Sequence, residues 1–452
     1  MATTQLSPQA AASAADPAFT VTDSERRRAL FGSAVGSTIE WYDYFLYGTM
    51  SSIVFAKLFF PSDDPLTSQL LALASFALAF LIRPVGGIVF AHIGDRVGRK
   101  KTLVMTLSIM GLSTVMIGLT PTYESIGVWS PILLTVFRLL QGLALGGEWG
   151  GGVLLAVEYA PANKRGFFGA VPQTGALFGL ALGNLVTSGL STVFSEEAFL
   201  SYGWRIPFVL SIVLVMIGMW IRHKVEETPS FKKVAAQAKN NPSAAAEHKL
   251  PLTETLTQHW RSVLIAIGAK FVETSTFFLF ATFTISYLVA QGYKRVEALN
   301  VVLIAALLAV PVMLYFGALS DRIGRKKVFV LGTIAIAIYA GPYFWLLNQG
   351  SAVISTVAVV IGFSIIWSTY GSVLGTFFAE SFPANVRYTG ISLGYQVGAA
   401  LVGGPMPLIA TALMARYDGS YVPVAIFIAL CALVSLIAIS FTKDRTGQPL
   451  DS

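Results

Sequence analysis

The chain has 452 residues, of which 54% are hydrophobic and 12% are charged, and its formal net charge is +7. Its mean hydropathy is +0.67, whereas soluble domains carry about 25% charged residues. A soluble core cannot hide this much apolar surface, and the 41 glycines fit membrane helices better than soluble ones. The composition therefore excludes a soluble protein and predicts one that crosses the membrane several times.

Residues 1–28 are rich in Ala, Ser and Thr, and we expect them to form a disordered cytoplasmic tail. The first apolar stretch follows Arg26–Arg28 and resembles the start of a signal peptide. It carries Glu40 and Asp43, however, and it lacks a cleavage site of small residues. We therefore expect it to be retained as the first membrane span.

Twelve apolar segments, most of them about 18 residues or longer, predict twelve transmembrane helices in two blocks of six. The first block comprises 29–54, 68–91, 102–120, 130–157, 166–193 and 205–222. The second comprises 262–290, 298–319, 328–347, 352–379, 388–414 and 421–441. The predicted fold is an all-α membrane protein with an N-terminal six-helix bundle (29–222), a cytoplasmic linker (223–261), a C-terminal six-helix bundle (262–441) and a cytoplasmic tail (442–452). The linker has room for an amphipathic helix at the membrane surface.

The basic residues predict the orientation of the chain. Most of the 31 Lys and Arg residues lie in the even-numbered loops and near the two ends. Because positive charge accumulates in cytoplasmic loops, we expect both termini in the cytoplasm and a multi-pass protein of the plasma (inner) membrane. The net charge then reflects topology, and no nucleic-acid partner is implied. Three basic residues fall within spans: Arg83, Arg138 and Lys270.

Two sequence motifs occur twice, in matching loops of the two blocks. The segment 94–101 (GDRVGRKK) recurs at 320–327 (SDRIGRKK), and 158–165 (EYAPANKR) recurs at 380–387 (ESFPANVR). Each pair follows the second or the fourth span of its block. An even number of spans per block preserves orientation, so the blocks are parallel repeats, as in one common class of transporters.

These motifs resemble those of the major facilitator superfamily. The pattern G-x-x-x-D-R-x-G-R-K is complete at 317–326, whereas the first copy matches from Asp95 onward and has Ala91 in place of the first Gly. Arg138-x-x-Gln141-Gly142 is similar to the signature of the fourth helix, and 226–229 (EETP) to the acidic motif after the sixth. The resemblance implies two bundles that rock about a central cavity to give alternating access.

A narrower resemblance is to the metabolite:proton symporter family, and it extends over nearly the whole chain. The segments that carry it are 40–44 (EWYDY), 83–86 (RPVG), 140–151 (LQGLALGGEWGG) and 380–383 (ESFP). The resemblance implies proton-coupled transport of a small carboxylic metabolite such as citrate, shikimate, proline or betaine. It also favours an acid in the first helix and an arginine in the fourth as functional residues.

Charged residues inside spans are costly in hydrocarbon, so they are candidates for function. Arg138 offers a planar fork for a carboxylate, and Asp43 beside it suits proton coupling, because burial and a nearby cation move a carboxyl pKa in opposite directions. An ion pair that does not titrate during transport is the structural alternative. We expect Arg83 to extend towards the interface or to pair with an acid across it, with contact to the substrate as the less favoured alternative. The predicted substrate-binding residues are Arg138, Gln141, Tyr47, Lys270, Trp367, Tyr370, Tyr395 and Gln396; the proton-coupling candidates are Asp43, Glu40, Glu148 and Glu273.

The repeated loops predict the gates. An acid within a basic loop can pair with a nearby arginine or cap the N-terminus of a neighbouring helix. Ion pairs between the repeats would then lock the cytoplasmic side and break when the halves rock, although plain topology charge is the simpler interpretation of the lysines. The predicted gating residues are Asp95, Arg99, Glu158, Arg165, Asp321, Arg325, Glu380 and Arg387.

No catalytic cluster, nucleotide-binding loop or metal-ligand spacing occurs in the sequence, so we expect no enzyme activity, no metal and no cofactor. The predicted function is proton-coupled uptake of a small carboxylic metabolite by a monomer whose other partners are the proton and the lipid bilayer. Uptake of a zwitterionic osmolyte such as proline or betaine, and efflux of organic acids, are the alternatives. Only about ten residues follow the last predicted span, which argues against the coiled-coil extension of osmosensing members.

Overall fold

The computed structural model describes residues 23–97, 99–146, 149–158, 160–224, 251–383, 386–448 and 450. Most of the predicted N-terminal tail, 1–22, and most of the predicted linker, 225–250, lie outside this part of the chain, as does the suggested amphipathic helix. Within the described ranges the regular secondary structure is helical and contains no strand.

The first half contains six membrane-crossing segments. Its elements are α1 (Asp23–Met50), η3 (Ser51–Phe55), α2 (Ala56–Leu58), α3 (Pro65–Val97), α4 (Arg99–Leu119), α5 (Tyr123–Ile126), α6 (Trp129–Gly146), α7 (Trp149–Glu158), α8 (Arg165–Val193), α9 (Glu196–Ser201), η4 (Gly203–Arg205) and α10 (Ile206–Lys224). Asp64 precedes α3 and accepts hydrogen bonds from the backbone N–H groups of Leu66 and Thr67, both 3.1 Å away. It therefore supplies acceptors for the free donors at the start of that helix.

The second half repeats this arrangement. Its elements are α13 (Pro251–Gln258), α14 (Trp260–Phe278), η5 (Leu279–Phe283), α15 (Thr284–Ala290), α16 (Arg295–Ile323), α17 (Arg325–Leu347), α18 (Ala352–Val359), η6 (Val360–Trp367), α19 (Ser368–Ser381), α20 (Arg387–Gly398), η7 (Ala399–Gly403), α21 (Met406–Arg416) and α22 (Val422–Ser440). Gly324 separates α16 from α17 with φ 104°. This positive φ favours glycine, which is the tight turn expected of the repeated basic loop.

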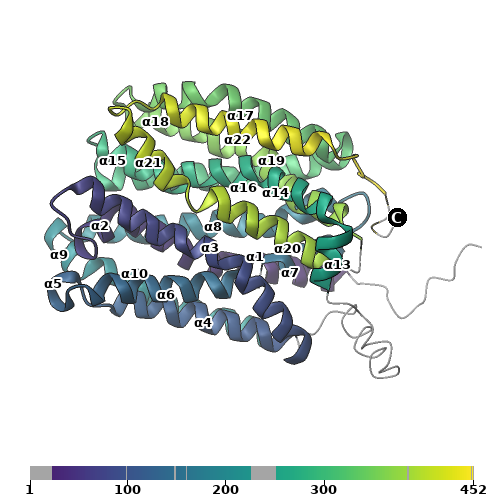
Figure 1. The fold of residues 1–452 in the computed structure, drawn as a ribbon, viewed down its shortest axis with the longest axis horizontal. Helices are drawn as coiled ribbons and strands as arrows, with labels where there is room; N and C mark the ends of the chain where they lie inside the picture. Colours follow the sequence, from purple (N-terminus) through teal and green to yellow (C-terminus); the bar gives the residue numbers. More distant parts are fainter. Residues whose placement is uncertain are drawn as a thin grey trace, which may run out of the picture.

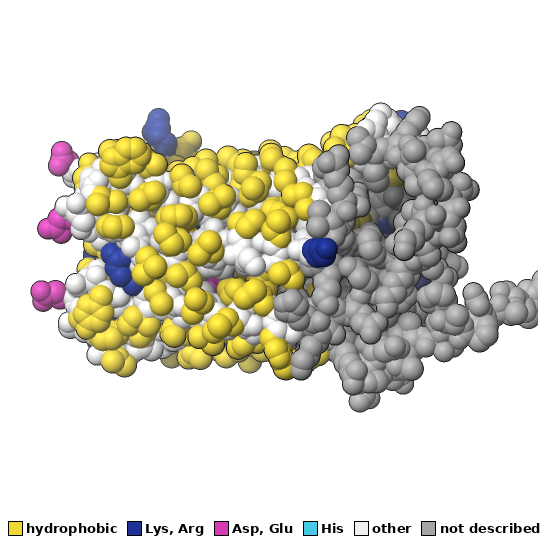
Figure 2. Space-filling view, turned by 90° about the horizontal axis from the view of Figure 1, so that it is seen from below, with side chains coloured by type: hydrophobic (Ala, Val, Ile, Leu, Met, Phe, Trp, Pro, Cys, Tyr) yellow, Lys and Arg dark blue, Asp and Glu magenta, His cyan; other side chains and the backbone are white. Residues whose placement is uncertain are grey.

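The length and composition of the helices agree with a twelve-helix membrane protein. Ten described helical segments are long and apolar enough to span a membrane, and Val104–Leu119 is a shorter apolar helix. The segment from α1 to α2 completes the set of twelve. Hydrophobic side chains cover the middle of the face that Figure 2 shows. The predicted fold class is therefore confirmed.

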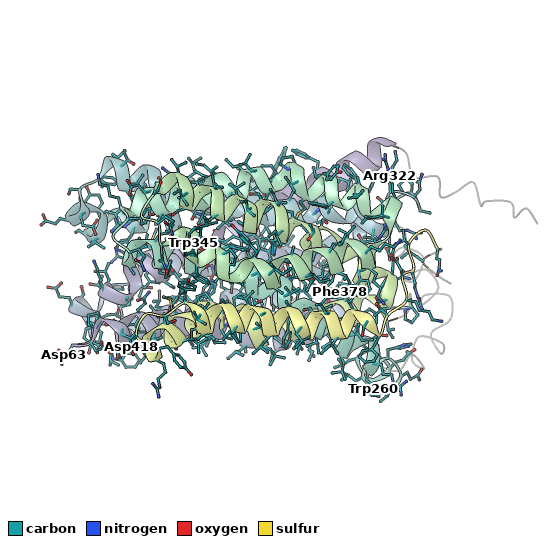
Figure 3. All side chains as sticks on the ribbon, turned by 90° about the horizontal axis from the view of Figure 1, so that it is seen from above. Asp63, Trp260, Arg322, Trp345, Phe378 and Asp418 are labelled. Atoms are coloured by element: carbon teal, nitrogen blue, oxygen red, sulfur yellow. The ribbon has the colours of Figure 1, made fainter. Side chains whose placement is uncertain are left out.

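The two halves pack side by side along the membrane-crossing direction (Figure 1). Helix α8 of the first half runs along α16 of the second, and α3 packs against α20, η7 and α21. Arg322 and Trp260 lie at one end of the bundle, and Asp63 and Asp418 at the other (Figure 3). We call the first the inner end, because the sequence assigns it to the cytoplasm, and the second the outer end.

Candidate functional site

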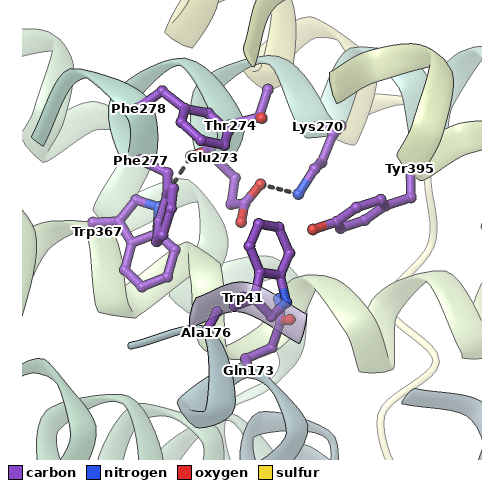
Figure 4. Close-up of a pocket in the computed structure, with 10 residues that line it drawn as sticks. All are labelled: Trp41, Gln173, Ala176, Lys270, Glu273, Thr274, Phe277, Phe278, Trp367 and Tyr395. Carbon is purple, nitrogen blue, oxygen red and sulfur yellow. Dashed lines mark hydrogen bonds and ion pairs between the residues drawn. The ribbon is translucent and has the colours of Figure 1, made fainter. Parts of the chain in front are cut away.

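A small central cavity of about 20 Å³ lies between the two halves. Four residues that the sequence singled out, Lys270, Glu273, Trp367 and Tyr395, line it (Figure 4). The other lining residues are Trp41, Gln173, Ala176, Thr274, Phe277 and Phe278. The wall is therefore mostly aromatic with a few polar groups, which is the usual composition of a small-molecule site.

The second half contributes a buried ion pair to this cavity. Lys270 and Glu273 lie three residues apart on α14 and contact each other through Nζ and Oε2. Nζ also lies 3.6 Å from the centroid of the Tyr395 ring, and Trp367 donates from Nε1 to the backbone oxygen of Glu273 at 3.0 Å. Both charges of this pair are thus held by partners within the second half.

The first half holds a hydrogen-bonded chain of four buried side chains. Arg138 donates from Nη1 to Oε1 of Gln141 at 2.7 Å. Gln141 donates from Nε2 to the hydroxyl of Thr114 at 2.7 Å, and that hydroxyl donates to Oδ2 of Asp43 at 3.1 Å. We had expected Asp43 beside Arg138, but no direct ion pair joins them in the described part of the chain. Gln141 and Thr114 connect them instead.

Arg138 is fully buried among aromatic rings. Its guanidinium carbon lies 4.0 Å from the ring centroid of Tyr44, 4.2 Å from that of Tyr47 and 4.9 Å from that of Phe76. Such stacking stabilises a desolvated cation. Its Nε and Nη2 have no hydrogen-bond acceptor within the described residues. The hydroxyl of Tyr47 pairs with that of Ser75 at 2.8 Å, so Tyr47 contributes its ring rather than a free hydroxyl.

Arg83 of α3 lies in the same aromatic enclosure and is 2% exposed. Its guanidinium carbon is 4.3 Å from the ring centroids of both Tyr44 and Phe80. The expectation that Arg83 would extend to the interface is therefore wrong, because α3 directs this side chain into the bundle among aromatic rings. Within the described residues no carboxylate pairs with it.

Close contact between α3 and α6 brings the two arginines together. A Cβ on Gly142 would lie 2.3 Å from the backbone oxygen of Ala79, and one on Gly146 would lie 2.1 Å from that of Arg83. Any side chain at either position would push the helices apart. Small residues thus allow close helix packing, and the glycines of 142–151 include the ones that position Arg83 and Arg138.

The remaining predicted site residues do not line the central cavity. The hydroxyl of Tyr370 pairs with that of Thr276 at 2.8 Å, and Gln396 donates from Nε2 to the backbone oxygen of Gly146 at 3.2 Å across the halves. Glu40 is buried in α1 outside the set of lining residues. The side chain of Glu148 lies outside the described part of the chain.

Asp321 joins the two halves at the inner end. It pairs with Arg325 at 2.9 Å and accepts hydrogen bonds from the backbone N–H groups of Gly166, at 2.8 Å, and Phe167, at 3.0 Å. These donors lie at the start of α8, where the helix dipole favours a negative charge. Arg325 also contacts Glu380 at 3.3 Å. The side chains of Asp95 and Arg99, the counterparts in the first half, are not described.

The second repeated motif forms a further contact between the halves at the inner end. Nη1 of Arg387 lies 3.9 Å from Oε1 of Glu158. Thr376 donates to the backbone oxygen of Arg165 at 3.1 Å, while the Arg165 side chain points to the end of the chain. The predicted gating residues that are described are therefore together at one closed interface.

The residues after α22 cross this interface as an extended strap, which we define as residues 441–448 and 450. The Arg165 side chain donates to the backbone oxygen of Gln448 at 2.6 Å, and that of Arg387 donates to the backbone oxygen of Leu450 at 2.5 Å. Asp444 accepts from the backbone N–H of Lys326 at 3.2 Å. The strap therefore bonds to both halves of the protein.

Asp444 is the anchoring carboxylate of the strap. Partial burial by itself would raise its pKa, but hydrogen bonds from the hydroxyl and N–H of Thr446 and from the N–H of Lys326, together with the charge of Arg325, lower the pKa below its usual value. Asp444 therefore remains ionised at neutral pH and holds the start of α17.

The outer end is closed as well. Arg295 at the start of α16 pairs with Glu196 of α9 at 2.5 Å, and Ser188 of α8 donates to Asn300 of α16 at 2.9 Å. Both contacts cross between the halves. Contacts between the halves are therefore made at both the inner and the outer end of this structure.

Comparisons with known proteins identify the family. The family described as sugar (and other) transporter matches residues 29–452. The chain belongs to this family of the major facilitator superfamily. It is 38% identical to the shikimate transporter of Escherichia coli (strain K12) over 431 residues, which cover 94% of this chain and 96% of that protein. It is 34% identical to the proline/betaine transporter of the same organism over 437 residues, which cover 95% of this chain and 86% of that one.

The solved structure of a D-xylose–proton symporter has the same fold. It superimposes with a TM-score of 0.73 at 16% identity and covers 93% of this chain and 99% of that protein. This likeness agrees with the twelve-helix fold of the major facilitator superfamily. The predictions of a multi-pass membrane transporter and of the metabolite:proton symporter resemblance are confirmed, and the family and relatives are transporters rather than enzymes.

Sequence reasoning missed several residues of the site. Trp41 lies within the segment 40–44, but no charge or repeat marks it as a site residue, and no motif includes Gln173 of α8. Phe277 and Phe278 follow Glu273 by a single helical turn. Their position on the same helix face as a predicted residue was the one sign in the sequence that they belong to the site. Aromatic side chains in a membrane helix, however, are more often packing residues. Glu196 and Arg295 of the outer end were also missed, since neither belongs to a repeat.

Proposed function

We propose that this transporter takes up a small carboxylic metabolite together with a proton, by alternating access about the central cavity. We further propose that it works as a monomer in the inner membrane with both termini in the cytoplasm. Three observations support this: the family, the similarity to a protein named shikimate transporter, and the buried basic side chains Arg83, Arg138 and Lys270, of which Lys270 lines the cavity.

The chain from Arg138 to Asp43 is the observation that carries the proposal. Arg138 has N–H groups that no acceptor in the described part of the chain occupies, and two intervening side chains connect it to a buried acid. Binding at one end of such a chain can therefore influence protonation at the other. No similar chain joins Glu273 to Arg138 in the described residues.

The Thr114 hydroxyl provides a physical means of coupling. Its oxygen lies 3.1 Å from Asp43 Oδ2 and 2.9 Å from the backbone oxygen of Met110, so its single proton can be donated to either. An ionised Asp43 accepts a hydrogen bond from the Thr114 hydroxyl. A protonated Asp43 donates its own O–H to Thr114, whose hydroxyl then turns to Met110. The oxygen that Gln141 contacts thus changes its hydrogen bonding with the charge on Asp43, and Gln141 in turn orients Arg138.

In the proposed cycle, Arg138 binds the substrate carboxylate while Asp43 takes up a proton from the outer side. The contacts between Glu196 and Arg295 then close the outer end. The Asp321 contacts to the start of α8 must break before the inner end opens, because they connect the two halves directly. Release of the substrate and of the proton to the cytoplasm completes the cycle.

Asp43→Asn tests the coupling. In proteoliposomes with an inwardly directed proton gradient, we expect the parent protein to accumulate labelled shikimate or a related carboxylic acid, and a protonophore to abolish accumulation. Asp43→Asn should lose gradient-driven accumulation but retain exchange of labelled for unlabelled substrate. Asn keeps the hydrogen-bonding shape and removes only the titratable proton.

Asp64→Asn is the matched control, because Asp64 is an exposed acid at the outer end and asparagine also caps helices. This variant should transport like the parent. Gradient-driven accumulation by Asp43→Asn would show that Asp43 is not the coupling acid. Uptake by the parent that ignores the proton gradient would exclude proton symport altogether.

A zwitterionic osmolyte is the second candidate substrate. The similarity to a protein named proline/betaine transporter at 34% identity supports it, and so does the aromatic wall formed by Trp41, Phe277, Trp367 and Tyr395, since aromatic faces bind quaternary ammonium groups. Competition of unlabelled betaine, proline and shikimate for uptake distinguishes the two candidates. Efflux predicts accumulation only in inside-out vesicles.

A further inference from the structure

Arg83 differs from every other buried arginine that the structure describes. The remaining ones, Arg138, Arg165, Arg325 and Arg387, each donate to an amide, carboxylate or backbone oxygen. Within the described residues no acceptor is found for Arg83, whose Nε and Nη2 are buried and unpaired. Leaving a buried charged donor unpaired is strongly unfavourable, so such a group calls for an explanation in ligand binding.

The unpaired groups around Arg83 occur together. Among the described residues, Nε and Nη2 of Arg138 are likewise buried without an acceptor, and the hydroxyl of Tyr44 has no partner. The ring of Tyr44 contacts both guanidinium groups, at 4.3 Å from Arg83 and 4.0 Å from Arg138. One aromatic enclosure therefore contains two cations and a hydroxyl, with free N–H groups on both cations and no carboxylate paired to either one within the described residues.

Arg205 shows how a purely structural arginine is held in this protein. It stacks on Trp204 at 4.4 Å, as Arg83 stacks on its aromatic neighbours. In addition, its Nη1 donates to the backbone oxygens of Gly118 and Thr120, both at 2.7 Å. At Arg205, stacking on an aromatic ring thus accompanies ordinary hydrogen bonds. At Arg83, stacking on aromatic rings occurs without hydrogen bonds to the described residues.

We propose that Arg83 and Arg138 together form the carboxylate-binding site of this transporter, and that the Tyr44 ring covers both guanidinium groups when no substrate is bound. This inference rests on the proposed function and adds a residue to it. A guanidinium group binds a carboxylate through two parallel N–H···O hydrogen bonds. Each of the two arginines has two nitrogens without an acceptor among the described residues, and these can donate such bonds. The substrate carboxylate displaces the ring, and the Tyr44 hydroxyl supplies a further hydrogen bond.

The position of Arg83 also explains how binding reaches the cavity. Its guanidinium carbon lies 5.6 Å from the ring of Trp41, which lines the cavity. The Tyr44 ring packs against Phe278, another lining residue, at 6.4 Å between centroids. The Tyr44 ring also lies 5.7 Å from that of Trp41 between centroids, so movement of Tyr44 is transmitted to two residues of the cavity wall. A substrate bound in the cavity would reach Arg83 and Arg138 once these rings turn aside.

Binding measurements on detergent-solubilised protein test the proposal. Shikimate and its methyl ester are the probes, and binding is followed by the shift in melting temperature across a concentration series. We expect Arg83→Gln to weaken shikimate binding by at least 30-fold, Arg83→Lys by about 10-fold because one donor fork is lost while the charge stays, and Tyr44→Phe by about 3-fold. The ester should bind weakly to all of them.

Arg205→Gln is the matched control, since it removes a stacked arginine that already has acceptors. It should lower the melting temperature and leave shikimate affinity within 3-fold of the parent. Arg83→Gln that melts lower but binds shikimate like the parent would overturn the proposal, because Arg83 would then be structural like Arg205. If Arg83→Gln does not fold, Arg83→Lys is measured instead, and shikimate binding like that of the parent would again overturn the proposal.

The outcomes separate this inference from the proposed function. If Arg138→Gln abolishes binding and the Arg83 variants bind normally, only the role of Arg83 is wrong. If the parent binds neither shikimate nor any other carboxylic acid, betaine or proline in a panel, the proposed function itself fails. Equal binding of acid and ester by the parent would overturn the carboxylate site directly.

Discussion

The two halves of the protein treat their buried cations differently. In the second half, Lys270 pairs with Glu273 on its own helix and stacks on Tyr395. In the first half, Arg83 and Arg138 lie on separate helices and have N–H groups for which the structure describes no acceptor. The repeated fold thus places basic side chains near the centre of both halves but completes the hydrogen bonding in only one of them.

This difference assigns different tasks to the halves. A cation that already has an anionic partner contributes little binding free energy to an anionic substrate, because the new contact must replace an existing one. A buried guanidinium with unpaired N–H donors contributes the whole interaction, because no existing contact is lost. We therefore expect the first half to determine recognition of the carboxylate, and the second half to shape the cavity with its aromatic wall.

The largest expected effect comes from Arg138→Gln. Hydrogen bonds to charged groups contribute about 1.5–3 kcal/mol each, so loss of a two-bond contact should weaken substrate binding by about 100-fold or more. Initial rates of uptake over a range of substrate concentrations measure this. A variant that keeps its apparent affinity and loses only maximal rate would place the carboxylate elsewhere, and the comparison between the halves would fail.

The ion pair of the second half should respond as a unit. Lys270→Met and Glu273→Gln each leave one buried charge unpaired and should destabilise the protein by about 3–5 kcal/mol, whereas the double variant should be close to neutral. Melting curves of the three purified variants measure the difference. Recovery of both stability and substrate affinity in the double variant supports a structural pair. Recovery of stability without affinity would show that Lys270 binds substrate itself.

Gly142→Ala should disturb the first half selectively. Its Cβ would lie 2.3 Å from the backbone oxygen of Ala79, so α3 and α6 must separate. Such overpacking costs about 1–3 kcal/mol and also moves Arg138 away from Arg83. Substrate affinity and melting temperature should fall together. Gly189→Ala is the control, because nothing lies within 4 Å of a Cβ there; an equal loss in both variants would contradict the explanation.

The smallest effect is expected from removing residues 444–452. This deletion eliminates the hydrogen bonds from Arg165 and Arg387 to the strap while leaving the Asp321 contacts in place. We expect the inner end to open more often, and alkylation of Thr376→Cys to become several-fold faster. The background carries Cys431→Ser, since Cys431 is the only cysteine of the chain. Unchanged alkylation would show that the strap does not stabilise the closed state.

Much of the architecture followed from the sequence alone. The number of spans, the two repeats and the class of protein depend on hydrophobic length and loop charge, and these are local properties of the chain. The gating interpretation of Asp321 rested on its place in a repeated loop, and the structure puts it against the start of α8. Arg138 stood out because an isolated charge within an apolar span is rare.

Only the tertiary structure decided which groups contact each other. Asp43 and Arg138 lie 95 positions apart in the chain, and whether they pair directly depends on the packing of α1, α4 and α6, which brings Gln141 and Thr114 between them. The missing acceptors of Arg83, the outer contact between Glu196 and Arg295 and the strap over the inner end depend in the same way on helices remote in sequence. Local pattern determines that a residue is buried in a bundle, whereas its partners are set by which helices meet.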